Sequence, residues 1–290
     1  MTAFPYTLLD VFTRHPLAGN PLAVVHDADD LDDETMLAFA RETRLSETTF
    51  VQTAGTAGAT YRNRIWTIGG EIPFAGHPSL GTAVAVALRR GDRSAAYVQE
   101  TRAGLQPVDV LQAAESWRAS VLQEPASFGP EIGFERVLGA IGLDAADAHP
   151  TLRPQFVSTG LPTLIVPLAN IYALARARHD QAALGAIAPR VPTLNIYAIA
   201  FTSDSDEVRA RCFPTEPLEN EDPATGSAAG ALGAYLDRHS SIVKFRVLQG
   251  VEIGRASELD VLVDGERVRV SGSVVVIAEG TVYLPVSSGS

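Results

Sequence analysis

Cysteine and lysine are almost absent from this 290-residue sequence, in which each occurs once, as Cys212 and Lys244. A single thiol cannot form an internal disulfide bond or a thiolate metal cluster, and it cannot supply both bases of a two-thiol racemase. The residues around Lys244 are typical of a strand, which favours a charge on an edge strand over a Schiff-base role. Pyridoxal phosphate is therefore not expected as a cofactor.

Metal-binding patterns are also missing. The six histidines do not occur in H-x-x-x-H, H-x-H or H-x-x-E-H spacings, and the sequence has no dinucleotide-binding fingerprint. We therefore expect neither a metal nor any other cofactor. Catalysis by this chain has to depend on carboxylates, histidine and backbone dipoles.

Long apolar runs are lacking, since no stretch of about 18 apolar residues occurs, and the N-terminal residues show no signal-peptide pattern. A soluble cytoplasmic protein is the simplest expectation. The 34 acidic and 23 basic residues give a net charge of −11, which disfavours nucleic acid and anionic membranes as partners. The charge does not exclude a small anionic substrate, because local dipoles decide whether one is bound.

The hydrophobic content of 46% is enough for one large core or two medium ones. In the first part of the chain, short β-rich segments alternate with helical patterns. We expect helices at 30–43 and 76–88 and strands at 6–12, 22–25, 48–51 and 61–67.

A stretch rich in proline, glycine and polar residues, 123–131, is the best candidate for an interdomain linker. His77 and Asp222 are 145 residues apart (222 − 77), half of the chain length, which suggests two related halves. After the linker we expect helices at 134–141 and 171–187, and a loop followed by a helix within 221–236. We expect strands at 155–158, 163–167 and 195–202, and β-structure at 242–248, 259–263, 267–270 and 274–278.

Two helical segments rich in small residues follow glycine-bearing loops, one at Gly76 and one at Gly226. The first N–H groups of a helix lack intrahelical partners and favour an anion, so two such N-termini facing each other would bind a carboxylate. The alternative is that the glycines only allow close helix packing. For Gly76 and Gly226 we favour the anion-binding interpretation.

Three ionisable residues lie close to these loops or at the start of a strand: His77, Asp222 and Glu47. Each has an ordinary structural explanation, His77 as a hydrogen-bonding group, Asp222 as a helix cap or turn residue, and Glu47 as a solvated loop charge. Against apolar walls, however, a carboxylate acquires a pKa at which it can both give and take a proton.

Five motifs, in order along the chain, resemble those of the phenazine-biosynthesis PhzF family. They are Asp10-Val-Phe-Thr with Gly19-Asn20-Pro21, then Leu45-Ser46-Glu47-Thr48, then Glu71 to Ala83 (EIPFAGHPSLGTA), then Glu221 to Ser227 (EDPATGS), and finally Gln249-Gly250 with Gly254-Arg-Ala-Ser257. Together the motifs extend over nearly the whole chain.

This resemblance implies a diaminopimelate-epimerase-like α/β (α+β) fold. In that fold two pseudo-symmetric domains, each a curved, mostly antiparallel sheet wrapped around a central helix, hold the active site in the cleft between them. We expect an N-terminal domain at 1–124, completed by a C-terminal strand near 274–285, and a C-terminal domain at 125–273. Family analogy also suggests a homodimer.

The resemblance further implies a cofactor-independent isomerase or tautomerase of secondary metabolism. Its substrate would be a small carboxylate-bearing amino or hydroxy acid similar to trans-2,3-dihydro-3-hydroxyanthranilate. Carried over position by position, Glu47 would shuttle the proton, while His77 and Asp222 would orient and polarise the substrate. The substrate-binding residues would be Gly76, Ser227, Gly226, Ser46, Thr225 and Asn20.

The sequence also departs from its relatives. The related epimerases carry a cysteine in each of the two loops, whereas Cys212 lies outside both, so two-thiol racemisation is unsupported. The family's Phe-Thr-Pro motif is replaced at 66–70. Because the residues that line the pocket determine specificity, the sequence does not identify the substrate. Two alternatives remain. One is an amino-acid epimerase with carboxylate bases, and the other is a non-catalytic binding or scaffold protein, which would not need the complete set Glu47, His77, Asp222 and Ser227.

Overall fold

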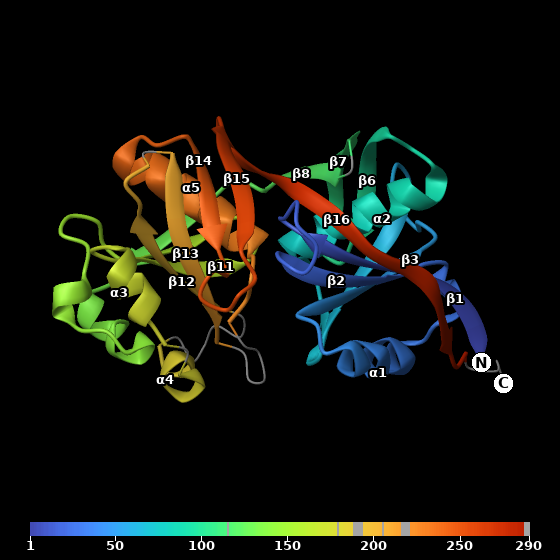
Figure 1. Ribbon diagram of the computed structural model, residues 1–290, viewed down its shortest axis with the longest axis horizontal. Helices are drawn as coiled ribbons and strands as arrows, with labels where there is room; N and C mark the ends of the chain where they lie inside the picture. The colour runs from blue at the N-terminus through green and yellow to red at the C-terminus, as the bar shows by residue number, and fades with distance from the viewer. Residues whose placement is uncertain (115, 179, 188–193, 205, 216–220, 287–290) are drawn as a thin grey trace. The chain divides into compact units, whose positions relative to one another are not determined.

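The chain forms two compact units in the computed structural model, which describes residues 1–114, 116–178, 180–187, 194–204, 206–215 and 221–286. Unit 1 consists of Met1–Val121 and Ser271–Ser290, and unit 2 of Leu122–Val270. Figure 1 shows both units and labels most of their helices and strands. No helix within the described ranges is both long and apolar enough to cross a membrane.

Unit 1 is built from strands with helices inserted between them. The last strand of the chain, β16 (Arg267–Leu284), begins in unit 2 and pairs antiparallel with β1 in unit 1. The other elements of unit 1 are β1 (Thr2–Val11), β2 (Asn20–Val25), the 3-10 helix η1 (Ala28–Asp30), α1 (Asp33–Thr43), β3 (Glu47–Gln52), β4 (Tyr61–Thr67), β5 (Gly70–Ile72), α2 (Gly76–Arg90), β6 (Ser94–Thr101), β7 (Gly104–Ala113) and β8 (Ser116–Leu122).

The strand order in unit 1 is β1-β2-β3-β4-β6-β7-β8. Neighbouring strands pair antiparallel except for β2 with β3 and β4 with β6, which are parallel. A parallel pair needs a crossover connection. In unit 1 a helix supplies each crossover, since α1 lies between β2 and β3 in the sequence and α2 lies between β4 and β6.

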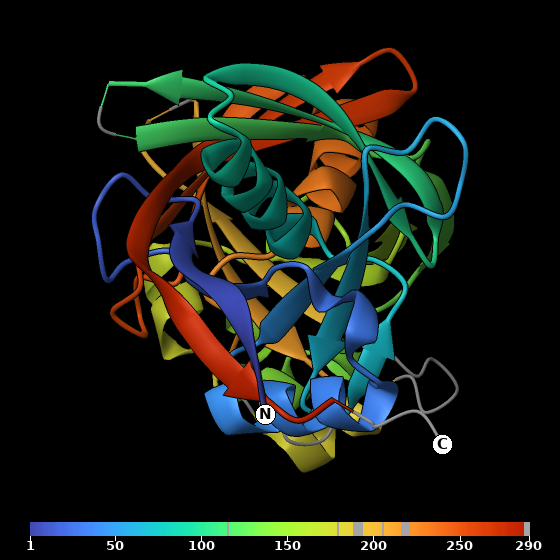
Figure 2. The same ribbon diagram turned by 90° about the vertical axis from the view of Figure 1, so that its right-hand side faces the viewer.

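Helix α2 is the central helix of unit 1. Its residues from Gly76 to Ala87 are all buried, and it contacts β1, β2, β3, β4, β6 and β7. A helix enclosed in this way needs small residues, because a Cβ on Gly81 would lie 2.6 Å from the Leu22 side chain. In Figure 2 the strands of unit 1 curve around α2, the teal helix.

Alternate residues of β3 face different helices. The Thr49 hydroxyl is hydrogen-bonded to that of Thr82 in α2 at 2.8 Å, whereas the next residue, Phe50, belongs to the core cluster that includes Met36 and Ala40 of α1. Because successive side chains of a strand point to opposite faces, the sheet of unit 1 is covered by α2 on one face and by α1 on the other.

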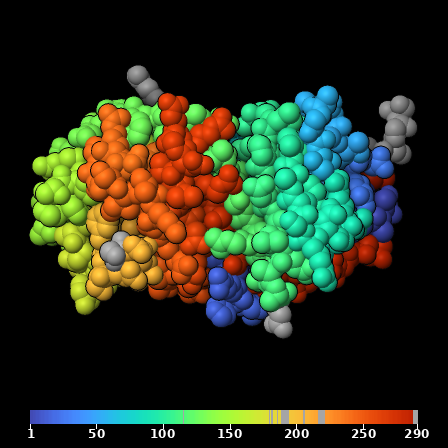
Figure 3. Space-filling model, turned by 90° about the horizontal axis from the view of Figure 1, so that it is seen from above, coloured from blue at the N-terminus to red at the C-terminus, as the bar shows by residue number. Residues whose placement is uncertain are grey.

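Unit 2 has the same construction. Helix α5 is buried from Gly226 to Leu236. In Figure 3 the orange and red chain that follows it, through β14 and β15, forms much of the visible surface of unit 2. The elements of unit 2 are β9 (Ser127–Glu131), the 3-10 helices η2 (Phe134–Arg136), η3 (Gly139–Ile141) and η4 (Ala145–Asp147), β10 (Gln155–Ser158), β11 (Pro162–Pro167), α3 (Ile171–Arg176), α4 (Gln181–Gly185), β12 (Asn195–Phe201), β13 (Glu207–Pro214), α5 (Gly226–Ser240), β14 (Lys244–Gln249) and β15 (Ser257–Asp264).

The strand pairing of unit 2 repeats that of unit 1. Its order is β9-β10-β11-β12-β13-β14-β15, antiparallel except for the parallel pairs β11 with β12 and β13 with β14. Helices α3 and α4 lie in the first crossover and α5 in the second, as α1 and α2 do in unit 1. The predicted fold class, two pseudo-symmetric diaminopimelate-epimerase-like halves, is confirmed.

Several local predictions are corrected. The segment 134–141 forms η2 and η3 instead of one helix, because low-propensity Gly139 lies inside it and Gly142 ends it with a positive φ of 71°. The segment 171–187 forms α3 and α4, since the backbone of Ala177 leaves the helical conformation (ψ 144°). The second half of the linker at 123–131 is β9, which pairs with β10.

Strand predictions near the C-terminus also change. The strands expected at 267–270 and 274–278 are one continuous strand, β16. Lys244 is exposed at the start of β14, but β14 lies between β13 and β15 and is not an edge strand. Strands β6, β7, β8 and β13 were not predicted at all.

Candidate functional site

His77 is the second residue of α2, and the start of β2 holds its ring. The Asn20 side-chain amide donates to Nδ1 of His77 at 3.1 Å, and Asn20 is fully buried. The residue before it has to be glycine: Gly19 has φ +68°, and a Cβ there would lie 2.4 Å from the Val11 carbonyl oxygen. The Gly19-Asn20-Pro21 motif therefore fixes the orientation of the imidazole.

Burial determines the protonation state of His77. It lowers the pKa of the ring to about 3, and the Pro21 carbonyl, which favours the charged form, only partly opposes this effect. The imidazole is therefore neutral near pH 7. Because Nδ1 accepts from Asn20, we assign the ring hydrogen to Nε2.

Glu47 lies next to His77. It is the first residue of β3, where the parallel pairing with β2 sets it opposite Leu22. Its Oε2 atom is 3.5 Å from Nε2 of His77, and its side chain is 15% exposed. In the described part of the chain Nε2 of His77 has no hydrogen-bond partner. A carboxylate and a neutral imidazole N–H thus approach each other in a largely buried setting.

The first turn of α2 is adjacent to this pair. Its N-cap residue, Ala75, has no side chain that can cap the helix, and the turn contains no acidic residue. The Ser79 hydroxyl donates back to the Ala75 carbonyl oxygen at 2.7 Å instead of accepting from an N–H group. The positive end of the helix dipole, at the amides of Gly76 and His77, is therefore suited to an anion.

The corresponding turn in unit 2 begins at Asp222. The Thr225 hydroxyl donates to Oδ2 of Asp222 at 2.5 Å, and the Asp222 N–H donates to the Cys212 carbonyl oxygen at 3.1 Å. Thr225 is the N-cap of α5 but does not cap it with its side chain. Gly226 and the buried Ser227 follow as the first two residues of the helix.

Gln249, a fully buried residue, connects the two ends of this turn. Its Nε2 atom donates to the Asp222 carbonyl oxygen at 2.8 Å and to the Thr225 hydroxyl at 3.0 Å. Its Oε1 atom accepts from the Tyr197 hydroxyl at 2.8 Å and from the Thr225 N–H at 3.2 Å. Next to it, a Cβ on Gly250 would lie 2.6 Å from the Pro223 carbonyl oxygen, which explains the Gln249-Gly250 motif.

The structure therefore brings the predicted site residues together in two sets. In unit 1, Ser46 is exposed in the turn that leads into Glu47. The set in unit 1 is Asn20, Ser46, Glu47, Gly76 and His77, and the set in unit 2 is Asp222, Thr225, Gly226 and Ser227.

The helix starts in the two sets are equivalent by position. The 145-residue spacing of His77 and Asp222, however, is not the repeat distance. Gly76 and Gly226 each begin a 15-residue helix and are 150 residues apart (226 − 76). His77 therefore corresponds to Ser227. Asp222 corresponds to Ile72, so the acid and the imidazole are not symmetry mates.

Metal ligands do not gather at either set. Among the residues that the structure describes, no group of three or more His, Cys, Asp or Glu side chains could hold a metal ion. Cys212 is buried in β13, and His179 lies outside the described residues. The ionisable residues of the two sets are Glu47, His77 and Asp222.

Comparison with known proteins places the chain in a family. The family model described as "Phenazine biosynthesis-like protein" matches residues 9–280. The chain belongs to the PhzC-PhzF family. The predicted resemblance is thereby confirmed, and so, at the level of the family, is the prediction of an isomerase.

Individual proteins similar to this chain support the family assignment. The trans-2,3-dihydro-3-hydroxyanthranilate isomerase of Pseudomonas aeruginosa is 37% identical, over 96% of this chain and 99% of its own. A Bacillus anthracis PhzF-family crystal structure matches with a TM-score of 0.86 and 28% identity, over 98% of this chain and all of that one. A probable proline racemase from Agrobacterium radiobacter, 14% identical with a TM-score of 0.66 over 97% and 93% of the chains, shares only the fold.

Sequence reasoning assigned no role to Gln249, although it belongs to a quoted motif. It also missed two buried arginine–glutamate pairs, Arg64 with Glu71 and Arg211 with Glu221. A signal was present in the repeated pattern E-x-P-x-x-G, which occurs at 71–76 and again at 221–226.

Proposed function

We propose that this PhzF-family protein catalyses a cofactor-independent isomerisation, in which a proton moves from one carbon to another of a small carboxylate-bearing substrate. The observation that carries the proposal is the contact between Glu47 and His77. A carboxylate oxygen lies 3.5 Å from the Nε2 atom of an imidazole that burial keeps neutral, directly beside the uncapped start of α2. Proton transfer by a positioned carboxylate needs no metal or cofactor.

In the proposed reaction Glu47 removes a proton from a substrate carbon. The electron pair of that C–H bond moves into the adjoining unsaturated system, and the carboxylic acid of Glu47 then delivers a proton to a second carbon. The carboxylate is thereby restored, so no oxidant, reductant or other reactant is consumed. The N–H group of His77 orients the substrate and the carboxylate during both transfers.

Substrate binding is proposed for the remaining residues. The amides of Gly76 and Gly226 and the side chain of Ser227 hold the substrate carboxylate, because helix N-termini favour anions. Asp222 orients an amino or hydroxyl group. Of the others, Asn20 acts by fixing the imidazole, Thr225 by orienting Asp222, and the exposed Ser46 by contacting substrate beside Glu47.

The substrate class is proposed from the relatives. The Pseudomonas aeruginosa protein is named for trans-2,3-dihydro-3-hydroxyanthranilate, a compound with a carboxylate, an amino group and a hydroxyl group. We propose that this protein acts on a substrate of that kind in secondary metabolism. We also propose that it is a cytoplasmic homodimer. Sedimentation that finds only monomer at micromolar concentration would contradict the dimer.

The proposal is tested by incubating the purified protein with trans-2,3-dihydro-3-hydroxyanthranilate and related cyclic amino and hydroxy acids in deuterated water. Proton NMR should show a shifted double bond and deuterium at a new carbon. Inversion of a stereocentre without bond migration, detected by chiral chromatography, would instead favour an epimerase with carboxylate bases. Saturable binding without any exchange would favour a binding protein.

A further inference from the structure

The segments before α2 and α5, which in unit 1 begin within β5, share a pattern. Each reads E-x-P-x-x-G, from Glu71 to Gly76 in unit 1 and from Glu221 to Gly226 in unit 2, and in each the glycine is the first residue of a 15-residue helix. His77 and Ser227 then occupy the same place, six residues after the glutamate. The two glutamates have no role in the proposed reaction, although their side chains are almost fully buried.

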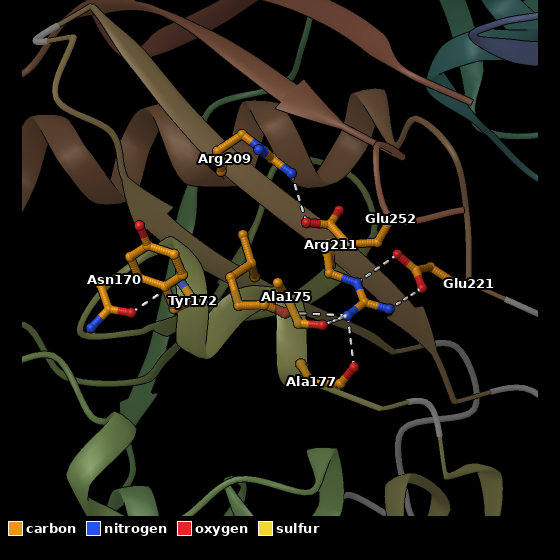
Figure 4. A network of polar contacts seen from close by, with 9 residues as sticks. Asn170, Tyr172, Ala175, Ala177, Arg209, Arg211, Glu221 and Glu252 are labelled. Carbon is orange, nitrogen blue, oxygen red and sulfur yellow. Dashed lines mark hydrogen bonds and ion pairs between the residues drawn. The ribbon is translucent and has the colours of Figure 1, made fainter. Parts of the chain in front are cut away.

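In unit 2 the glutamate is bound by an arginine of β13 (Figure 4). Arg211 donates to both oxygens of Glu221, from Nε at 2.8 Å and from Nη2 at 2.5 Å, and the side chains are only 9% and 8% exposed. Its Nη1 atom donates to carbonyl oxygens at the end of α3, those of Leu174 at 3.2 Å and Ala177 at 2.6 Å. Every nitrogen of the guanidinium is thus bonded, and it ties the loop to α3.

In unit 1 a similar arrangement is made with other neighbours, although Glu71 lies in β5 and its Oε2 atom also accepts from the exposed Arg102 at 3.2 Å. Arg64 of β4 donates to both oxygens of Glu71, from Nε at 2.9 Å and from Nη2 at 2.7 Å, and the side chains are 10% and 6% exposed. Its Nη1 atom pairs with Asp33 of α1 at 2.8 Å. The third guanidinium nitrogen again reaches the helix of the first crossover, here α1 instead of α3.

An aromatic residue two positions further along the strand completes each arrangement. The Arg64 guanidinium carbon lies 5.3 Å from the Trp66 ring centroid, and that of Arg211 lies 5.0 Å from the Phe213 centroid. A planar guanidinium between a carboxylate fork and an aromatic face has little freedom to move. We use the term loop clamp for the pairs Arg64–Glu71 and Arg211–Glu221.

Stability alone does not explain the loop clamps. Desolvation of a buried ion pair offsets most of its Coulomb attraction, and replacing both partners by apolar residues is often neutral for folding. What a two-bond fork does supply is a fixed geometry. The glutamate lies five residues before the helix, and a misplacement of about 1 Å in a catalytic group can cost about a hundredfold in rate.

We infer that Arg64, Glu71, Arg211 and Glu221 are positioning residues, which fix the loops before α2 and α5 and thereby aim the residues that begin those helices. Each clamp acts within its own unit, on Gly76 and His77 in one case and on Gly226 and Ser227 in the other. This inference rests on the proposed function for its effect on turnover, but not for its effect on the loop geometry.

The experiment replaces both members of a clamp, because a single replacement would leave a buried charge without its two-bond partner. The variants are Arg64→Met/Glu71→Leu and Arg211→Met/Glu221→Leu. The matched control is Arg209→Met/Glu252→Leu, which removes an ion pair of 2.6 Å, 17% and 15% exposed, that also starts from β13 but does not include the loop before α5. Figure 4 shows this pair near the Arg211 clamp.

The readouts are kcat, KM, the melting temperature, and the amide NMR shifts of the first two residues of α2 and α5. Both clamp variants should stay folded and lose at least about tenfold in kcat, while the control loses less than about twofold. An Arg211→Lys variant should also have a lower kcat than the parent, because an ammonium group cannot form the two-bond fork. Clamp variants with the parent kcat and amide shifts would overturn the inference.

Failure of the proposed function gives a different result. If no substrate is turned over, the amide shifts of Gly76, His77, Gly226 and Ser227 still report loop geometry. Shifts that move in the clamp variants and not in the control would support positioning even then. A fall in melting temperature with unchanged shifts and unchanged turnover per folded molecule would show that the clamps only stabilise the units.

Discussion

The side-chain amide of Asn20 lies 3.1 Å from Nδ1 of His77, and this contact leaves Nε2 of the same ring directed at Glu47. The donor to Nδ1 selects the tautomer of the ring. The position of the hydrogen that faces the Glu47 carboxylate therefore depends on Asn20, which itself need not touch the substrate.

An Asn20→Leu substitution keeps the approximate size of the side chain but removes this donor. We expect kcat to fall by about tenfold or more, because the imidazole can then adopt the other tautomer. Nitrogen NMR of the His77 ring should show the change directly. As a control, Asn63→Leu removes another buried amide of unit 1, which donates to Gln99 at 2.9 Å, and should leave kcat nearly unchanged.

The second prediction concerns Gln249. A Gln249→Leu variant removes the bonds to Asp222, Thr225 and Tyr197, and unsatisfied buried groups cost about 1 to 3 kcal/mol each, so the free energy of unfolding should fall by at least about 2 kcal/mol. Turnover at saturating substrate should fall as well, because the turn from Asp222 to Thr225 loses its support. Urea unfolding and steady-state kinetics measure the two effects.

A control separates these effects. Gln155 is also buried in unit 2 and donates to the Gly129 carbonyl oxygen at 3.0 Å, far from the turn in sequence. A Gln155→Leu variant should lose stability without losing turnover per folded molecule. Equal losses of turnover in both glutamine variants would contradict a specific role for Gln249.

A third prediction is acid sensitivity between about pH 6.5 and pH 5. Burial lowers the pKa of His26 and of His77 to about 3, whereas histidine in an unfolded chain has a pKa of about 6.5. Below pH 6.5 the unfolded chain therefore binds more protons than the folded one, and the free energy of unfolding decreases as the pH falls. Each histidine contributes a slope of up to about 1.4 kcal/mol per pH unit.

Urea unfolding at pH 7, 6 and 5 tests this slope above the range where most carboxylates titrate. A His26→Gln variant should have a smaller slope than the parent, because one of the two buried histidines is gone. His26 is hydrogen-bonded to the Thr7 hydroxyl at 3.0 Å and has no part in the proposed reaction. An unfolding free energy that stays constant from pH 7 to pH 5 would show that these histidines are not buried as the structure has them.

The sequence was sufficient to locate the elements that carry the site. Strands such as 61–67 are marked by β-branched and aromatic residues, and α2 is marked by small residues after a glycine, because an enclosed helix admits little else. The five family motifs also contain Asn20, Glu47 and Asp222.

The remaining features depend on contacts that no local pattern encodes. Arg211 and Glu221 meet only because the chain between β13 and α5 turns back toward β13. From sequence alone, an arginine in a strand is ordinarily taken for a surface residue. The helix predicted at 134–141 was wrong because apolar spacing does not distinguish an α-helix from successive 3-10 turns around Gly139. The spacing of His77 and Asp222 correctly predicted two related halves, although these two residues are not equivalent in the two halves.

A fourth prediction is independence from metal ions. Catalysis in the proposal relies on Glu47, His77 and backbone amides, so activity should survive dialysis against a strong chelator, and the purified protein should show no visible absorption band. Metal analysis of active preparations by mass spectrometry provides the check. Activity that is lost on dialysis and restored by a divalent metal would overturn the proposed chemistry, whatever the substrate.

The last prediction concerns the proton itself. A Glu47→Gln substitution keeps the size of the side chain and its ability to bond to His77 but removes the base. The variant should fold and bind substrate analogues like the parent, while kcat falls by at least about a hundredfold, the usual scale for the loss of general acid or base catalysis. An Asp222→Asn variant should also be slower, but with a larger share of the loss in KM, because its proposed task is orientation.

Isotope labelling completes this test. In deuterated water the product of the parent enzyme should carry deuterium at the reprotonated carbon, to the extent that the proton held by Glu47 exchanges with solvent before it is returned. Glu47 is 15% exposed, which allows some exchange, so we expect incorporation to be partial instead of complete. A Glu47→Gln enzyme that retained most of its kcat and the same labelling would exclude Glu47 as the shuttle, and the base would then have to be sought at Asp222.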